Sequence, residues 1–168
     1  MDIICTKCSH NKLNYFMIEG VEFKNLISHV DERGYFRELL RKDDNILVEG
    51  LGQTSHSLVH PGVVKAWHGH VYQTQWNYVV NGLIYVALYD NRKKSSTYKE
   101  TMTFLVGDHQ KSQVYKFPPG VLHGYKCVSG PMNIIYFTSG QYDLDDEIRI
   151  EHDDRDIAFD WINIFKIK

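Results

Sequence analysis

The chain offers very little from which to build helices. It contains no long stretch in which apolar residues recur every three or four positions. Short segments rich in β-branched and aromatic residues follow one another instead, separated by turn residues. The expected strands are Val21–His29, Tyr35–Arg41, Gln53–Leu58, Val63–His68, Trp76–Val80, Leu83–Asp90, Glu100–Val106, Gln113–Phe117, Val121–Cys127 and Met132–Ser139. This pattern predicts an all-β fold, a sandwich or jelly-roll barrel with few short helices.

Glycine and proline residues mark the expected turns between these strands. The dipeptide Asn81-Gly82 lies between two apolar runs and predicts a tight type I′ hairpin. The run Leu83–Tyr89, which follows it, has no polar alternation, so we expect both of its faces to be covered. Further turn signals are Gly34, Pro61-Gly62, Pro118-Pro119-Gly120 and Gly130-Pro131.

Length and composition limit the class of protein. A chain of 168 residues without a linker or internal repeat predicts one domain, residues 21–168, preceded by an N-terminal arm, residues 1–20. The formal charge of -2 argues against a general nucleic-acid or membrane-surface binder. We find no membrane-spanning run and no signal peptide, and the odd count of three cysteines fits a reducing cytoplasm. Cys5 and Cys8 form half of a zinc site, for which the chain has no second CxxC.

Histidine is unusually abundant, with nine residues, and three of them fall in an ordered pattern. His68 and His70 are two residues apart on an expected strand, so their side chains point to the same side. His123 follows the turn Pro118-Pro119-Gly120. The two segments resemble the two cupin motifs, with Gln75 in place of the usual acid. Three histidines and a glutamine are compatible with a zinc, nickel or iron site, but equally with side chains packed and hydrogen-bonded in a β core.

A more specific resemblance covers the chain from about Val21 to Trp161. The segment Asp31–Glu38 is similar to the DxRGxFxE segment of the dTDP-4-dehydrorhamnose 3,5-epimerase family. Further segments resemble that family in the same order along the chain. They are Gly62–His68, Pro118–Gly124, the position of Tyr136, and the closing stretch Ile148–Trp161. The chain is thus similar to this family over nearly its whole length.

The resemblance implies a role for nine residues. His68 would be the catalytic base, Asp154 its carboxylate partner and Tyr136 the opposing acid. No cofactor and no metal would take part. The substrate would be a nucleotide-diphosphate sugar, and the protein would be a cytoplasmic homodimer. Arg33 and Glu38 would reach the nucleotide from the neighbouring subunit. The remaining expected substrate contacts are Gln53, Lys65, Gln75 and His123.

These residue types suit the chemistry of a 4-keto sugar. Its carbons beside the carbonyl carry acidic hydrogens, so epimerisation removes one as a proton, forms an enolate and returns a proton to the other face. The reaction needs a base, an acid on the opposite face and a positive group near the ketone oxygen. Histidine has an unperturbed pKa near neutrality, which suits His68 to the role of the base. Tyr136 would supply a proton, and Lys65 would carry the positive charge.

Four departures from the family pattern leave the substrate open. Lys65 replaces an arginine, Ala66 a glycine, Gly69-His70 an aromatic-glutamine pair, and Gln75 a lysine. A divergent member that acts at one carbon, on another sugar or on another nucleotide would be compatible with them. Three further hypotheses remain: a 3,4-ketoisomerase that uses the same enolate, a metal-dependent cupin enzyme, and a non-catalytic cupin that binds sugar nucleotides.

Overall fold

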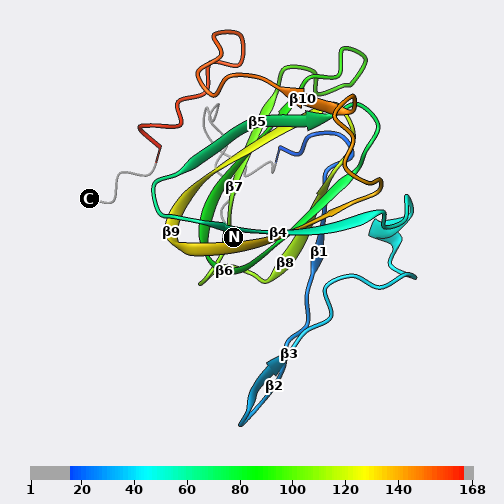
Figure 1. Cartoon of the computed structure of the whole chain (residues 1–168), viewed down its shortest axis with the longest axis vertical. Helices are drawn as coiled ribbons and strands as arrows, with labels where there is room; N and C mark the ends of the chain where they lie inside the picture. The colour runs from blue at the N-terminus through cyan, green and yellow to red at the C-terminus, as the bar shows by residue number, and fades with distance from the viewer. Residues whose placement is uncertain (1–15, 165–168) are drawn as a thin grey trace.

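The computed structural model describes residues 16–164, which form a β-barrel of two facing layers (Figure 1). The strands are β1 (Glu22–Asn25), β2 (His29–Asp31), β3 (Gly34–Phe36), β4 (Gln53–Val59), β5 (Val64–His70), β6 (Gln75–Asp90), β7 (Thr101–Gly107), β8 (Gln113–Phe117), β9 (Val121–Thr138) and β10 (Glu147–Arg149). Within the described part, the one helical element is a 3₁₀ turn, Asn45–Leu47. The all-β prediction is therefore confirmed. Cys5 and Cys8 lie outside the described residues.

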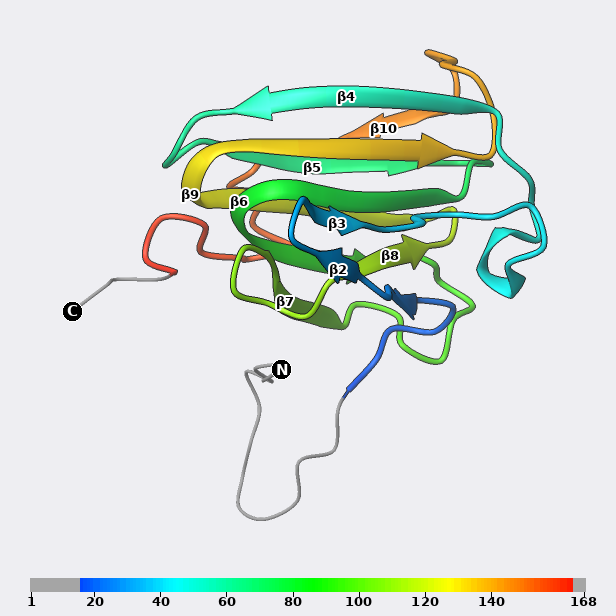
Figure 2. The same cartoon turned by 90° about the horizontal axis from the view of Figure 1, so that it is seen from below.

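The two layers are the two halves of one antiparallel sheet. One layer has the order β1-β8-β6-β9-β4, and the other has the order β7-β6-β9-β5-β10. Strands β6 and β9 belong to both layers, because each is long enough to bend from one layer into the other. Figure 2 shows the two strands curving together at one side of the barrel. This shared bend closes the jelly roll and places two walls of side chains opposite each other.

The predicted hairpin at Asn81-Gly82 is wrong. Strand β6 runs through this dipeptide from Gln75 to Asp90, and both of its halves pair with β9 rather than with each other. The pairing register shifts between Val79 and Ile84, and Gly82 adopts a φ of +83°. The glycine thus permits a bend in a continuous strand, since a left-handed conformation strains any residue with a Cβ. The turn predicted at Gly130-Pro131 is also wrong, because this dipeptide lies within β9 and not between two strands.

The barrel is held together by apolar clusters between and beside the layers. The largest one includes Ile18, which is only 1% exposed, so the described end of the predicted N-terminal arm packs into the domain. A second cluster joins Trp67 of β5 to Trp161 near the chain's end, with ring centroids 5.0 Å apart. A Cβ at Gly124 would lie 2.4 Å from the Cβ of Ala66, so β5 and β9 approach closely at this point. No helix of the described residues is long and apolar enough to cross a membrane.

The β2–β3 hairpin projects away from the barrel (Figure 1). Every residue of the two strands is exposed. Val30, Tyr35 and Phe36 are among them, although their side chains are apolar and exposed by 75%, 59% and 65%. Apolar side chains presented on a projecting arm are typical of a segment that packs against another molecule.

Candidate active site

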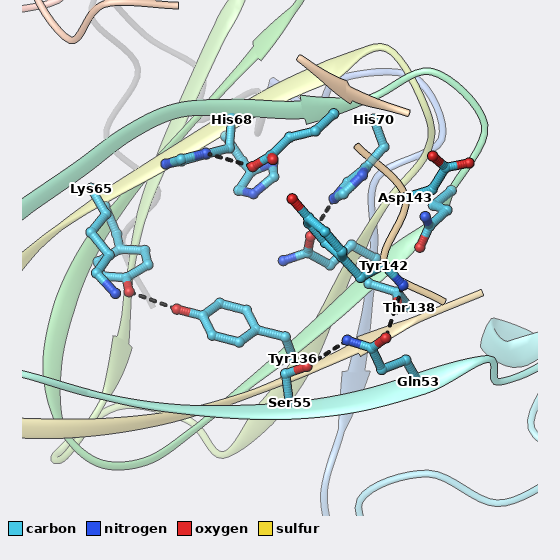
Figure 3. Close-up of a pocket in the computed structure, with 14 residues that line it drawn as sticks. Gln53, Ser55, Lys65, His68, His70, Tyr136, Thr138, Tyr142 and Asp143 are labelled. Atoms are coloured by element: carbon cyan, nitrogen blue, oxygen red, sulfur yellow. Dashed lines mark hydrogen bonds and ion pairs between the residues drawn. The ribbon is translucent and has the colours of Figure 1, made fainter. Parts of the chain in front are cut away.

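A cavity of about 430 Å³ opens between the two layers of the barrel (Figure 3). Strands β4 and β9 supply one wall, and strands β5, β9 and β10 supply the other. The lining residues are Gln53, Ser55, Lys65, His68, His70, Gln73, Gln75, His123, Tyr125, Tyr136, Thr138, Tyr142, Asp143 and Glu147. Six of the nine site residues predicted from the sequence are thus brought together in one cavity.

His68 lies on the wall formed by β5. Its Nδ1 is 3.6 Å from Oε1 of Glu147, which comes from the neighbouring strand β10. Burial lowers the pKa of His68, and the Glu147 carboxylate opposes this effect only in part. Arg149 donates a hydrogen bond of 2.9 Å to the same carboxylate and lowers its pKa. At neutral pH the site therefore holds a neutral imidazole beside an ionised carboxylate, which is the arrangement of a general base and the group that orients it.

Asp154 does not lie beside His68, contrary to the sequence-based prediction. Its Oδ1 accepts hydrogen bonds from the backbone N–H groups of Asp156 and Ile157, at 2.9 and 3.0 Å. It therefore closes a local turn in the C-terminal segment and does not line the cavity. Because β10 pairs antiparallel with β5, the acid that reaches His68 is Glu147.

Tyr136 lies on the opposite wall, in the half of β9 that pairs with β4. Figure 3 shows its ring extending into the cavity across from His68. Its hydroxyl oxygen lies 2.7 Å from that of Tyr125, which belongs to the other half of β9. Burial raises the pKa of Tyr136, while hydrogen bonds from Tyr125 and Ser57 oppose this effect. Tyr136 is therefore protonated at neutral pH, as an acid must be before it reacts.

Lys65 and His123 complete the wall of β5 and β9. Lys65 is the direct cross-strand neighbour of Tyr125, and His123 is that of His68. The ammonium group of Lys65 has no salt-bridge partner among residues 16–164, so its charge is available to the cavity. Burial, followed by the neighbouring His70 and His68, lowers the pKa of His123 well below the usual range. His123 is consequently a neutral ring, and it packs against Phe117 at a centroid distance of 4.5 Å.

His70 and Gln75 join the two layers through a buried polar network. Nδ1 of His70 lies 3.0 Å from Oδ2 of Asp146, a side chain that is 2% exposed. Its Nε2 lies 3.1 Å from Oε1 of Gln75, whose amide nitrogen donates to Asn77. Both ring nitrogens of His70 are thus engaged by other side chains.

The cupin histidines do not have the spacing of a metal site. Within residues 16–164, one group of three His, Cys, Asp or Glu side chains brings its ligand atoms within 4.8 Å of one another. This group is Glu151, His152 and Asp153, and it is fully exposed on the C-terminal segment. The histidines that line the cavity do not belong to this group.

The remaining predicted residues divide between the cavity and the hairpin. Gln53 lies in the cavity and accepts a hydrogen bond of 2.9 Å from the backbone N–H of Tyr142. Arg33 lies on the projecting hairpin, paired with Asp31, and does not reach the cavity of its own chain. Glu38 follows the hairpin and pairs with Arg41 at 3.6 Å.

Sequence reasoning did not identify Glu147, Tyr125 or Asp146 as site residues. Glu147 precedes Ile148-Arg149-Ile150, whose period of two predicts a half-buried strand, and that signal was available. Tyr125 lies two residues after His123 and therefore on the same face of the strand. What the sequence does not contain is the register of β10 against β5, which decides the acid that faces His68.

Fold and site together define a cupin barrel with one cavity, in which a histidine beside a carboxylate lies on one wall and a tyrosine lies on the other. Comparison with known proteins makes this class more specific. Residues 16–168 match the family described as dTDP-4-dehydrorhamnose 3,5-epimerase. The chain belongs to the dTDP-4-dehydrorhamnose 3,5-epimerase family, a family of sugar-nucleotide epimerases.

Individual relatives agree with this assignment. The spore coat polysaccharide biosynthesis protein SpsL of Bacillus subtilis is 42% identical over 153 residues, which cover 89% of this chain and 100% of SpsL. The probable low-salt glycan biosynthesis epimerase Agl13 of Haloferax volcanii is 35% identical and covers 86% of this chain and 94% of its own. Among solved structures, the dTDP sugar isomerase of Desulfovibrio desulfuricans G20 has a TM-score of 0.81 and 28% identity, and covers 87% of this chain and 93% of its own.

Proposed function

We propose that the protein epimerises a nucleotide-diphosphate-activated 4-keto deoxysugar at C3, at C5 or at both, through an enolate. The observation that carries this proposal is the pair formed by His68 and Tyr136. They extend into one cavity from opposite layers of the barrel (Figure 3). A half-buried neutral imidazole on one side and a protonated phenol on the other are the two groups that inversion at carbon requires.

The reaction begins at His68. Because its Nδ1 is turned toward Glu147, Nε2 is the atom that faces the substrate and takes the proton. The C–H electron pair moves into the enolate, and the imidazolium that forms is stabilised by the Glu147 carboxylate. Tyr136 then gives its proton to the same carbon from the other face. The tyrosinate regains a proton and the imidazolium loses one to solvent, so the protein returns to its starting state.

Lys65 stabilises the enolate oxygen in this mechanism. Its ammonium group lies in the cavity without a salt-bridge partner among the described residues. A full positive charge beside a developing oxyanion in a partly buried site is a strong source of transition-state stabilisation. We assign sugar contacts to Gln75 and His123 and a nucleotide contact to Gln53, all of which line the cavity.

A homodimer accounts for Arg33 and Glu38. The cavity of a single chain offers one lysine to a substrate that carries two phosphates, whereas Arg33 projects outward on the exposed hairpin. We propose that this hairpin packs on a second copy and brings Arg33 and Glu38 to the partner's nucleotide. We also propose a cytoplasmic location, in agreement with the buried free thiol of Cys127.

The proposal is tested by proton exchange with solvent. The protein is incubated in D₂O with dTDP-, GDP- and CDP-linked 4-keto-6-deoxysugars, and NMR records deuterium at C3 and C5. We expect incorporation at one or both carbons with one of these nucleotides, together with inverted product. His68→Ala abolishes the exchange, whereas His60→Ala, which removes an exposed histidine outside the cavity, leaves it unchanged.

Three results would contradict the proposal. One is the absence of exchange with every sugar nucleotide in a folded protein. Another is full exchange in His68→Ala. The third is a product whose keto group has moved to C3, which identifies a 3,4-ketoisomerase.

Analytical ultracentrifugation tests the dimer, and Arg33→Ala is expected to raise KM without abolishing exchange. A monomeric wild-type protein with full activity would refute the dimer.

A further inference from the structure

Tyr125 and Tyr136 meet across the floor of the cavity although both belong to β9. Because β9 bends between the layers, its first half places Tyr125 beside β5, and its second half places Tyr136 beside β4. Their hydroxyl oxygens are 2.7 Å apart, the distance of a strong O–H···O hydrogen bond. Tyr125 is only 4% exposed, and its direct cross-strand neighbour is Lys65.

We propose that Tyr125 is a positioning residue for the proton donor. It donates its hydrogen to the Tyr136 oxygen, so that the Tyr136 proton points into the cavity, and it stabilises the phenolate left behind when that proton is delivered. This inference rests on the proposed function and adds to it a residue that the sequence motifs do not include.

The direction of the hydrogen bond follows from counting protons. Each hydroxyl carries one hydrogen and can accept others. If Tyr136 donated to Tyr125, its only proton would point along the tyrosine pair and away from the sugar. If Tyr125 donates, the Tyr136 proton is free for the substrate. The second arrangement is the one compatible with proton transfer to carbon.

The surroundings favour Tyr136 as the partner that ionises. Burial and the adjacent Tyr136 raise the pKa of Tyr125 far above the usual range, so Tyr125 keeps its proton. Tyr136 is hydrogen-bonded to Tyr125 and to Ser57 of β4, and both contacts act to lower its pKa. The titratable groups that line the cavity together with Tyr136 are Lys65, His68 and His70 of β5, His123 and Tyr125 of β9, Tyr142 and Asp143 of the following loop, and Glu147 of β10. Tyr115 of β8 also interacts with Tyr136.

The chemical step then balances without a further reactant. The O–H bond of Tyr136 breaks, and a C–H bond forms at the enolate carbon. The negative charge moves from the enolate to the Tyr136 oxygen, which lies 2.7 Å from the Tyr125 hydroxyl. Tyr125 itself loses no proton.

The test is the pH dependence of kcat in Tyr125→Phe. A hydrogen bond to a charged group stabilises it enough to change a rate roughly 10- to 100-fold. We expect kcat to fall by about this factor with little change in KM. Since the phenolate loses a donor, we also expect the alkaline limb of the profile to move to higher pH. Tyr78→Phe is the matched control, because it removes a buried tyrosine hydroxyl that is bonded to Arg37 outside the cavity.

A second variant distinguishes an effect on the hydrogen bond from a structural defect of Tyr125→Phe. Replacement of Tyr125 by 3-fluorotyrosine preserves the shape of the ring and makes its hydroxyl a stronger donor. The alkaline limb should then move to lower pH, opposite to the shift in Tyr125→Phe. A structural defect would not move the limb in opposite directions in the two variants.

Two outcomes overturn the inference, and they differ from failure of the proposed function. Wild-type kcat in Tyr125→Phe refutes it, and so does an alkaline limb that stays in place in both variants. If His68→Ala is inactive while either result is obtained, the inference on Tyr125 fails and the epimerase function remains. If His68→Ala retains exchange, the proposed function itself fails.

Discussion

The carboxylate that assists His68 can be identified by replacing Glu147 with glutamine. The substitution keeps the size and shape of the side chain and removes the charge 3.6 Å from Nδ1. Two unit charges about 4 Å apart interact by about 4 kcal/mol at an effective dielectric constant of 20. His68 is 37% exposed and Arg149 shares the carboxylate, so solvent and a second cation reduce this value. We therefore expect Glu147→Gln to reduce the stabilisation of the His68 imidazolium by roughly 1 to 2 kcal/mol. This loss would lower kcat/KM about 5- to 30-fold.

The interaction between Glu147 and His68 also determines the direction in which the pH dependence of kcat/KM shifts. Glu147 raises the pKa of His68 against the lowering by burial. Its removal therefore lowers the pKa of His68 further, and the acid limb of kcat/KM moves to lower pH. At neutral pH the base remains unprotonated in both proteins, so the lower rate reflects the weaker imidazolium and not a smaller fraction of active base.

Asp154→Asn provides the comparison, and the assay is solvent deuterium exchange measured across pH. An asparagine oxygen can still accept the turn hydrogen bonds of Asp156 and Ile157, so we expect near wild-type activity. The reasoning is refuted if Asp154→Asn loses as much activity as Glu147→Gln. An acid limb that does not move in Glu147→Gln would refute it equally.

Three further predictions concern the opposite wall, the strand contact and a buried carboxylate. Tyr136→Phe should lower epimerisation roughly 100-fold or more while exchange at the carbon that His68 deprotonates persists, as NMR in D₂O would record. Gly124→Ala should cost about 1 to 3 kcal/mol in urea unfolding, since its Cβ meets that of Ala66 at 2.4 Å, and Ala66→Gly should restore part of this loss. Asp90 is fully buried, and hydrogen bonds from Arg92, Ser95 and Thr97 overcome its burial and lower its pKa. Its stabilising effect is present above the unfolded pKa of about 4, so the stability gap between wild type and Asp90→Asn should narrow as pH falls below it.

Local patterns were sufficient to predict most strands. The period-two segments gave β8 with its observed ends, Gln113 and Phe117, and β4 to within one residue. The hairpin failed because Asn81-Gly82 is a strong local turn signal, whereas the structure is decided by pairing of both halves of β6 with β9. The strand partners of β6 lie 31 to 63 residues further along the chain, as the pairs Asp90–Val121 and Gln75–Thr138 show, and no window of neighbouring residues contains them.

In the site too, residues placed by local motif spacing could be predicted, whereas contacts that depend on the pairing of distant strands could not. His68, His70 and His123 were predicted because motif spacing fixes their faces within single strands. The partner of His68 was assigned to Asp154 and not to Glu147, because the resemblance of the closing segment Ile148–Trp161 to the family pattern implied that residue. Only the register of Glu147, Ile148 and Arg149 against β5 distinguishes them. Tyr125 was missed for a related reason, since its role depends on how far β9 bends.

In the proposed mechanism, the bend of β9 relates the two groups that act on opposite faces of the sugar. The group that delivers the proton and the strand that flanks the base are parts of one backbone, joined through the curvature near Gly130. A Cβ at Gly130 would lie 2.6 Å from the backbone nitrogen of Met132, so this curvature tolerates no side chain. In the proposed mechanism, the spacing between the proton donor and the base is thus set by one covalently continuous strand, which pairs with β6 on both sides of its bend. The two residues to which we assign the opposite faces of the sugar are therefore positioned when the chain folds, before any substrate enters.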